Sequence, residues 1–230
     1  MPQFLIMKLR GVMQSWGGHT YEDLRHTEVF PTRSAVVGLL GACLGIERSD
    51  REALTELNAS LSITARLDKH KHEMTRITDY HTIEGARTVK ETPRKDLTPT
   101  RREYLCDACY TVALANETVA AYDLDKIAAA LERPIFTPFL GRRSCPITWP
   151  LFDRLIDDAE DALGALRLVE PHSGMVYAEF ATDADADKNF HGSNRLRLRD
   201  VALYRRTRQF TTRHVYFRTD PPKQNEGSTS

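Results

Sequence analysis

The run Phe4-Leu-Ile-Met-Lys-Leu-Arg10, which Gly11 closes, predicts a buried β-strand at the start of the chain. Downstream, Pro31-Thr32 opens a helix that the apolar pattern extends from Arg33 to Ile46. Three glycines fall inside this helix, where each costs about 1 kcal/mol relative to alanine. Their spacing matches neither a P-loop nor a dinucleotide-binding fingerprint, so they predict close packing against a sheet or another helix. They are Gly38, Gly41 and Gly45.

Four further segments complete the predicted order of elements. A capping-box pattern, Ser49-x-x-Glu52, begins a second short helix. Alternating apolar and polar residues from Leu61 to Leu67 predict a strand with one buried face and one face in water. A strand from Glu103 to Leu114 and a helix from about Asp123 to Glu132 follow. The resulting order is β-α-β-β-α.

Composition is typical of a globular protein. The 230 residues are 41% hydrophobic and 28% charged, which excludes disordered, collagen-like and low-complexity classes. The longest weakly polar run, Ala35 to Ile46, is far shorter than the ~20 residues that cross a bilayer, so we expect no membrane span and no signal peptide. Four cysteines without a secretory signal predict free thiols in a reducing cytoplasm.

Charge is segregated along a chain whose formal net charge is zero. Residues 151–190 carry ten acidic and three basic residues, whereas residues 191–218 carry eight arginines and one acid. We expect an acidic helix from Leu151 to about Leu166, followed by basic strands and, over 220–230, a solvated tail. The segment from Thr75 to Arg102 is polar and basic, which predicts either a flexible loop or an extended functional arm.

The spacing Cys106-Asp-Ala-Cys109 is that of half a metal or redox motif. On one continuous strand, positions three apart project to opposite faces, so we interpret these thiols as buried and free. The eight histidines form none of the common catalytic or metal motifs, and we predict no metal site, cofactor or catalytic group. The alternative is metal-free RNA cleavage by His81 and Tyr80, or by Lys69 to His72, since a general base activates a 2′-hydroxyl.

Arginines beside aromatic rings, and one glycine turn, form the more informative pattern. Arginine makes bidentate phosphate contacts, stacked rings contribute ~1–3 kcal/mol per base, and a glycine turn lets backbone amides approach a strand. This combination favours single-stranded RNA as the ligand. The alternative, pairing of Arg195 to Arg199 with the acidic helix, stays open. The clusters are Arg101-Arg102 before Tyr104, the turn Gly141-Arg142-Arg143-Ser144, and Arg205-Arg206 with Arg208 after Tyr204.

Five blocks of sequence, in order along the chain, carry a family resemblance. They are Ser15-Trp-Gly17, Phe30-Pro-Thr-Arg-Ser34 running into Gly38-Leu-Leu-Gly-Ala-Cys-Leu-Gly-Ile46, Asp79-Tyr-His-Thr82, Arg102-Glu-Tyr-Leu-Cys-Asp107 and Phe139-Leu-Gly-Arg-Arg-Ser-Cys-Pro146. In these blocks the chain resembles the subtype I-E branch of the Cas-five family, repeat-associated (RAMP) subunits of the CRISPR surveillance complex Cascade. The match covers almost the whole chain and is weakest from Leu151 to Asn194 and in the tail.

The resemblance implies an α+β fold. We expect a ferredoxin-like, RRM-related domain with an antiparallel sheet over residues 1–150, a β-hairpin thumb inserted at about 75–102, and a smaller β-rich extension over 151–219. It implies a cytoplasmic ribonucleoprotein subunit in antiviral defence that binds the 5′ handle of the CRISPR RNA (crRNA). That subunit caps the filament of CasC backbone subunits, adjoins the large CasA subunit and meets target DNA only through the complex. Its thumb is expected to kink the RNA where handle meets guide.

The same resemblance implies binding without catalysis. Relatives in another subtype cut the repeat, so a metal-independent CRISPR-repeat endoribonuclease is the alternative function, and an adaptor whose arginines form only salt bridges is the third. Arg33, Arg142 and Arg143 are expected to contact phosphates. Trp16, His81 and Tyr104 are expected to contact bases or shape their pocket, although Trp16 and Tyr104 also fit a core. The full expected RNA-binding set is Trp16, Arg33, Ser34, His81, Arg101, Arg102, Tyr104, Arg142, Arg143, Ser144, Arg206 and Arg208.

Overall fold

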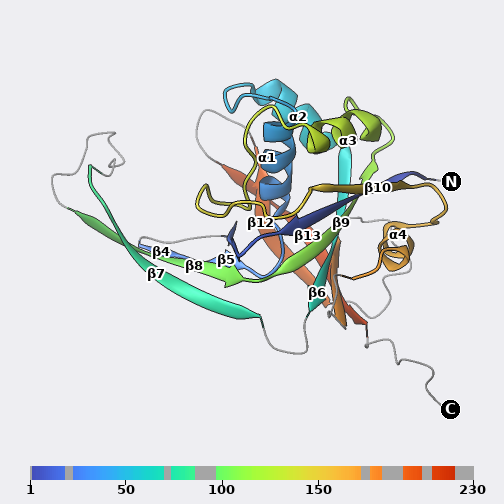
Figure 1. Cartoon of the computed structure of the whole chain (residues 1–230). Helices are drawn as coiled ribbons and strands as arrows, with labels where there is room; N and C mark the ends of the chain where they lie inside the picture. The colour runs from blue at the N-terminus through green and yellow to red at the C-terminus, as the bar shows by residue number, and fades with distance from the viewer. Residues whose placement is uncertain are drawn as a thin grey trace, which may run out of the picture.

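A seven-stranded antiparallel sheet forms the centre of the computed structural model, in the order β10-β1-β9-β6-β11-β13-β12 (Figure 1). The structure describes residues 2–18, 23–69, 74–85, 97–171, 177–182, 194–203 and 209–220. The strands of this sheet are β1 (Phe4–Arg10), β6 (Leu61–Lys69), β9 (Cys109–Asn116), β10 (Phe152–Ile156), β11 (Tyr177–Thr182), β12 (Asn194–Ala202) and β13 (Phe210–Asp220).

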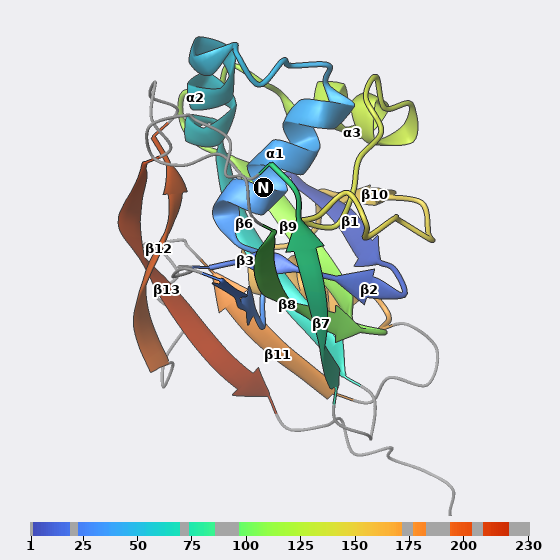
Figure 2. The same cartoon turned by 90° about the vertical axis from the view of Figure 1, so that its left-hand side faces the viewer.

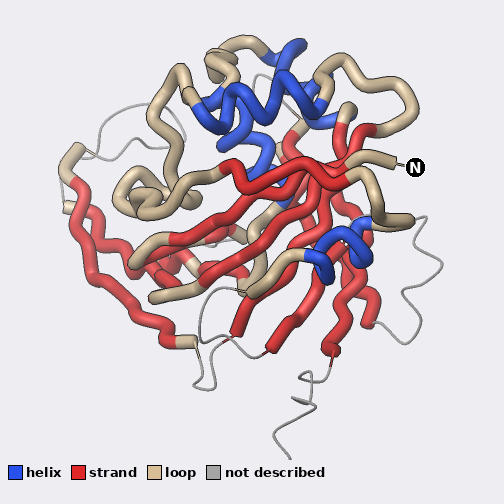
Figure 3. The backbone as a smooth tube through the Cα atoms, turned by 45° about the vertical axis from the view of Figure 1, so that its right-hand side comes forward, coloured by secondary structure: helices blue, strands red, loops and turns tan. Residues whose placement is uncertain are grey.

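Helices cover both faces of this sheet, which explains the continuous apolar run of β1. Leu5, Met7 and Leu9 lie in one core with α1 (Arg33–Cys43), α2 (Arg51–Ala59) and α3 (Leu124–Glu132). Phe4 and Ile6 point the other way, into a second core with α4 (Ala162–Leu168). Figure 3 shows α4 apart from the other three helices. No helix in the described part of the chain is both long and apolar enough to cross a membrane.

A second, smaller sheet projects from this body. Its main part is an antiparallel pair, β7 (Thr75–Ile83) and β8 (Thr98–Cys106), which we call the arm (Figure 1). The short strands β2 (Met13–Gln14) and β4 (Leu24–Arg25) pair with β8, and β3 (Trp16–Gly17) pairs with β5 (Thr27–Glu28). The expected basic insertion is therefore built from two paired strands over its described residues.

Helix α1 ends at Cys43, three residues before the predicted end. Gly45 has a φ of +74°, and amides of Gly45 and Ile46 donate to carbonyls of Ala42 and Gly41 at 3.2 and 2.8 Å, a Schellman ending. The predicted close packing is confirmed at Gly41, where an added Cβ would lie 3.0 Å from Leu54, but not at Gly38, which faces open space.

The predicted strand from Glu103 to Leu114 is wrong as one element. The chain turns at Asp107, which has a φ of +55°, so β8 and β9 belong to different sheets. Cys106 and Cys109 therefore lie on separate strands, and the one-strand argument against a shared metal does not apply to them. The capping box is also displaced, because Asp50 rather than Ser49 caps α2 by accepting from the Ala53 amide at 3.1 Å.

The predicted acidic helix from Leu151 to Leu166 is wrong. Residues Phe152–Ile156 instead form strand β10, which pairs antiparallel with β1 at the sheet edge. Pairing with an apolar neighbour outweighs helix propensity here. The helix begins only at Ala162, where the Asp161 carboxylate caps it by accepting from the Gly164 amide at 2.6 Å.

Strand β6 has no face in water, contrary to expectation. Its polar positions Arg66 and Asp68 are 4% and 2% exposed, because α4 covers them. Several predicted features fall outside the described residues, and these are His70 to His72 of the expected turn, the middle of the basic insertion over 86–96, Tyr204, Arg206, Arg208 and the tail over 221–230.

Candidate nucleic-acid interface

The turn over Gly141 to Ser144 requires glycine at its first position. Gly141 has a φ of +85°, and an added Cβ would lie 1.9 Å from the Ser15 carbonyl oxygen. The amide of Ser15 donates to the Leu140 carbonyl at 3.1 Å, and the buried Cys145 closes the turn by donating to the Arg142 carbonyl at 2.9 Å. The turn is thus held tightly against β2 and β3.

Arg142 fastens this turn to the base of the arm. Its guanidinium carbon lies 4.8 Å from the centroid of the Tyr104 ring. Its two terminal nitrogens donate to the carbonyls of Glu103 and Arg25 at 3.2 and 3.1 Å. Arg142 therefore positions the turn. Arg143 and Ser144 are exposed, and Arg143 has no ion pair or hydrogen bond within the described part of the chain.

The arm carries cations and an exposed ring beside the turn. Arg101 Nη1 lies 3.2 Å from Asp23, and its guanidinium lies 5.9 Å from the Tyr80 ring, which is 63% exposed. Arg102 donates from Nε to Thr100 Oγ1 at 3.2 Å and stands in register with Arg25. The base of the arm is therefore a basic surface with an accessible ring.

Glu103 compensates part of that positive charge. Its carboxylate lies 3.0 Å from His26 Nδ1 and 3.2 Å from Arg76 Nη1, and it accepts from the Thr27 amide at 3.2 Å. Burial alone raises the pKa of this carboxyl, but the hydrogen bonds from His26 and Thr27 and the charges of His26 and Arg76 outweigh it, so the pKa lies below its usual value. Glu103 consequently stays ionised and orders the cations around it.

A groove of about 1010 Å³ runs from this turn along helix α1, and we call it the α1 groove. It brings together Ser34 and Gly141, which are far apart in sequence but belong to two of the blocks that carried the family resemblance. Gly38 lies on its wall with open space beside it. Its charged and aromatic lining residues are Arg48, Arg51, Phe136, Phe139 and Phe210, with Glu47 as an acidic neighbour of Arg48. A groove with cationic and aromatic walls has the dimensions and chemistry for nucleotides.

Sequence reasoning missed Arg48 and Arg51. Both are exposed at the start of α2, and neither has an aromatic neighbour in the sequence that would have marked it as part of a binding site. The folded chain supplies the rings from elsewhere, because Phe136 and Phe139 come from the loop after α3.

Several residues of the predicted RNA-binding set do not line the α1 groove. Trp16 is fully buried and makes an edge contact with Tyr110, with 6.1 Å between ring centroids, and Tyr104 is 5% exposed. Arg33 donates to the Asn58 side chain at 2.9 Å and to the Leu61 carbonyl at 2.7 Å, so it holds α1 to α2 and β6. His81 lies on the arm, half exposed and 3.6 Å from Asp79. Trp16 therefore shapes the site from beneath, and Arg33 binds protein.

Within the described ranges, no three His, Cys, Asp or Glu side chains are grouped as metal ligands. Burial raises the pKa of the Cys43 and Cys109 thiols to about 11, which leaves both protonated at neutral pH.

A family model described as CRISPR-associated protein (Cas_Cas5) matches residues 4–216. The chain belongs to this Cas5 family. The Cas5 chain is 40% identical over 222 residues to "CRISPR system Cascade subunit CasD" of Escherichia coli (strain K12), covering 94% of this chain and 96% of that protein. The predicted family resemblance is confirmed.

Solved structures agree with this assignment. A chain in a structure described as "CRISPR RNA-guided surveillance complex" has a TM-score of 0.69 and 27% identity, covering 94% of this Cas5 chain and 89% of its own length. A second, described as "Crystal structure of Cas protein", has a TM-score of 0.64 and 26% identity, covering 96% of both chains. The mixed α/β fold with antiparallel sheets is thus shared with solved CRISPR-associated proteins.

Proposed function

We propose that this Cas5 protein is a non-catalytic subunit of a Cascade-type surveillance complex that binds the 5′ handle of the crRNA in the α1 groove. The observation that carries the proposal is the junction of three elements: the Gly141 turn, the start of α1 and the base of the arm. Within the described residues this junction combines rings with arginines at a single-strand-sized groove and offers no grouped metal ligands.

Each group at this junction has a distinct role in the proposal. The exposed Arg143, Arg48 and Arg51 neutralise phosphates, and Ser34 donates or accepts a hydrogen bond. Arg142 positions the turn through Tyr104 and the carbonyls it holds. Binding and positioning then suffice for function, with no bond made or broken in the RNA.

The strand order supports a ferredoxin-like, RRM-related core. Strands β1, β6, β9 and β10 occur in the order β10-β1-β9-β6, all antiparallel, with α1 between β1 and β6 and α3 between β9 and β10. In this proposal the arm is the thumb that kinks the RNA, and the chain caps a filament of CasC subunits in the cytoplasm, beside CasA and, through the complex, target DNA. The proposed division into residues 1–150 and 151–219 places β10, the edge strand of this core, in the second unit.

Incubation of the purified chain with labelled repeat RNA and mature crRNA, without metal, tests this function. We expect retention of the mature crRNA with both RNAs intact. Specific cutting of the repeat would select the endoribonuclease instead, and neither binding nor cutting would select the adaptor.

A variant that fills the groove tests the location of the site. Leucine at position 38 enters open space and favours a helix more than glycine does, so Gly38→Leu should fold with at least the original stability. We expect it to lose handle binding. Ala129→Leu, which places the same side chain at an exposed position of helix α3 that does not line the groove, is the matched control. Full handle binding by Gly38→Leu would remove the α1 groove from the site.

A further inference from the structure

We infer that the outer face of strands β12 and β13 is a second nucleic-acid-binding surface, which holds a phosphodiester backbone without reading its sequence. This surface, the arginine face, lies at the far edge of the main sheet from β10 (Figure 2). The inference does not rest on the proposed handle site. The arginine face comprises Arg195, Arg197 and Arg199 of β12 with His214 and Tyr216 of β13.

Strand alternation separates these residues from the core. Leu198 and Val215 point toward α1, and Val215 lies in the core with that helix. The residues between them point the other way, because Arg195 pairs in register with Tyr216 and Arg197 with His214. Arg195 and Arg197 are thus two residues apart on one face, about 6.8 Å along the strand, and Arg199 follows where the pairing with β13 shifts register between Leu198 and Val201.

The positive charge of this face is not neutralised within the described residues. Arg195 lies 3.4 Å from His214 Nε2 and 5.8 Å from the Tyr216 ring centroid. Arg197 donates to Thr212 Oγ1 at 3.1 Å, and Arg199 donates to the Phe210 carbonyl at 3.0 Å. None of these partners is a carboxylate. They orient the guanidinium groups and leave their net charge available.

Three described carboxylates make contacts away from this face. Asp200 lies on the opposite face, where it accepts from both Arg213 and the Arg33 amide. Asp153 pairs with Lys8 and Arg154, and Asp161 caps α4. The alternative in which these arginines pair with an acidic helix finds no such ion pair among the described residues, where that segment forms β10 and a capped α4.

The chemistry of the face favours a polynucleotide over an acidic protein. A regular row of guanidinium groups matches the regular charge of a phosphodiester backbone. An arginine stacked on Tyr216 presents a flat cationic surface to a base, and such stacking is tolerant of sequence. Carboxylates on a folded partner carry no such periodicity.

Binding of polynucleotides that lack the handle sequence tests this inference. The full chain and its triple variant Arg195→Gln/Arg197→Gln/Arg199→Gln are titrated with labelled oligouridine, oligothymidine and a DNA duplex across a range of salt. The matched control, Arg133→Gln/Arg154→Gln/Arg167→Gln, removes the same charge from exposed arginines outside both surfaces. Loss of three phosphate contacts should make the log–log salt slope for single strands shallower by about 2.

The three probes distinguish single-stranded RNA, single-stranded DNA and duplex DNA as the polymer that this face binds. We expect the arginine-face variant to lose affinity and slope for at least one probe while the control does not, and that probe names the polymer. A preference of the variant for handle RNA over oligouridine should persist, which separates this surface from the α1 groove. Equal loss in both variants, or loss in neither, overturns the inference. Unchanged nucleic-acid binding with lost co-purification of another Cascade subunit also overturns it and identifies a protein interface.

Discussion

Gly141 determines how closely the arginine-bearing turn approaches strand β3. Its left-handed backbone and the Ser15 carbonyl leave no room for a side chain. The fully buried Trp16 follows Ser15 and supports the turn from below. At the scale of single residues, groups that contact protein therefore build this turn, and the turn presents the exposed Arg143.

Two glycine substitutions should have opposite effects on stability. Gly141→Ala should lower the free energy of unfolding by more than the ~1–2 kcal/mol that a left-handed backbone costs, because the Ser15 clash adds to it. Gly38→Ala should raise it by about 0.5–1 kcal/mol, since Gly38 is helical and faces open space. Urea unfolding measures both. Equal effects would contradict the described turn.

The cysteines should differ in reactivity. Cys43 and Cys109 are buried with their pKa raised to about 11, and Cys145 is also buried with a raised pKa. Partial burial and the charge of Asp107 raise the pKa of Cys106 as well, but this thiol is only half-buried and is therefore the accessible one. Because the thiolate is the nucleophile, we expect iodoacetamide at neutral pH to alkylate Cys106 first and the others only on unfolding. Mass spectrometry of timed samples gives the order. Early modification of Cys43 would show that α1 opens locally.

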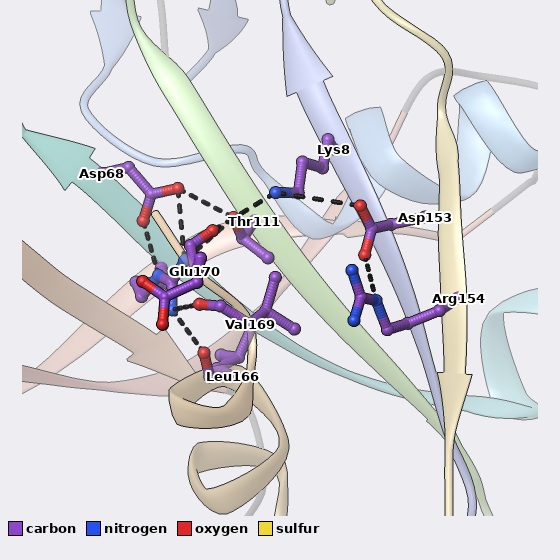
Figure 4. Close-up of polar contacts among 9 residues, drawn as sticks. Lys8, Asp68, Thr111, Asp153, Arg154, Leu166, Val169 and Glu170 are labelled. Atoms are coloured by element: carbon purple, nitrogen blue, oxygen red, sulfur yellow. Dashed lines mark hydrogen bonds and ion pairs between the residues drawn. The ribbon is translucent and has the colours of Figure 1, made fainter. Parts of the chain in front are cut away.

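The contact between α4 and strand β6 depends on a buried ion pair. Arg66 donates to Asp68, to Thr111 and to the carbonyls of Leu166 and Val169 at the end of α4. Figure 4 shows these acceptors gathered at one point of the sheet. Arg66 thus satisfies the last carbonyls of a short helix whose apolar side packs in the second core.

The costs of removing the two members of this pair should not add. Arg66→Met leaves a buried Asp68 and two helix carbonyls without their donor, and should destabilise the chain by about 3–5 kcal/mol. Arg66→Met/Asp68→Leu should cost less than the sum of the single changes. Chemical denaturation of the four proteins measures the coupling. Additive effects would mean that the two side chains act independently.

The local sequence pattern was sufficient to predict those helices and strands that do not depend on distant parts of the chain. The helix over Leu124–Glu132 and the strand from Leu61 were predictable from spacing and caps alone. The sequence could not show that α4 covers Arg66, or that Phe152–Ile156 pairs with β1, because both depend on residues distant in the chain. The split at Asp107 depends on a single left-handed residue.

At the scale of the whole molecule, tertiary packing decides which residues of the resemblance blocks reach the surface. Ser34 and Gly141, from two different blocks, meet in one groove. Arg33 and Trp16 belong to the same blocks but hold the fold together. The roles differ because burial and hydrogen-bond partners are set by tertiary packing, which sequence spacing does not encode.

The central claim is that the crRNA 5′ handle lies in the α1 groove of this protein. Reconstituted complex carrying crRNA with photoreactive uridines in the handle measures this directly, by cross-linking and mass spectrometry. We expect cross-links to this chain in the segments that line the groove, around residues 34–51 and 136–143. Cross-links from the handle to another subunit only would contradict the account.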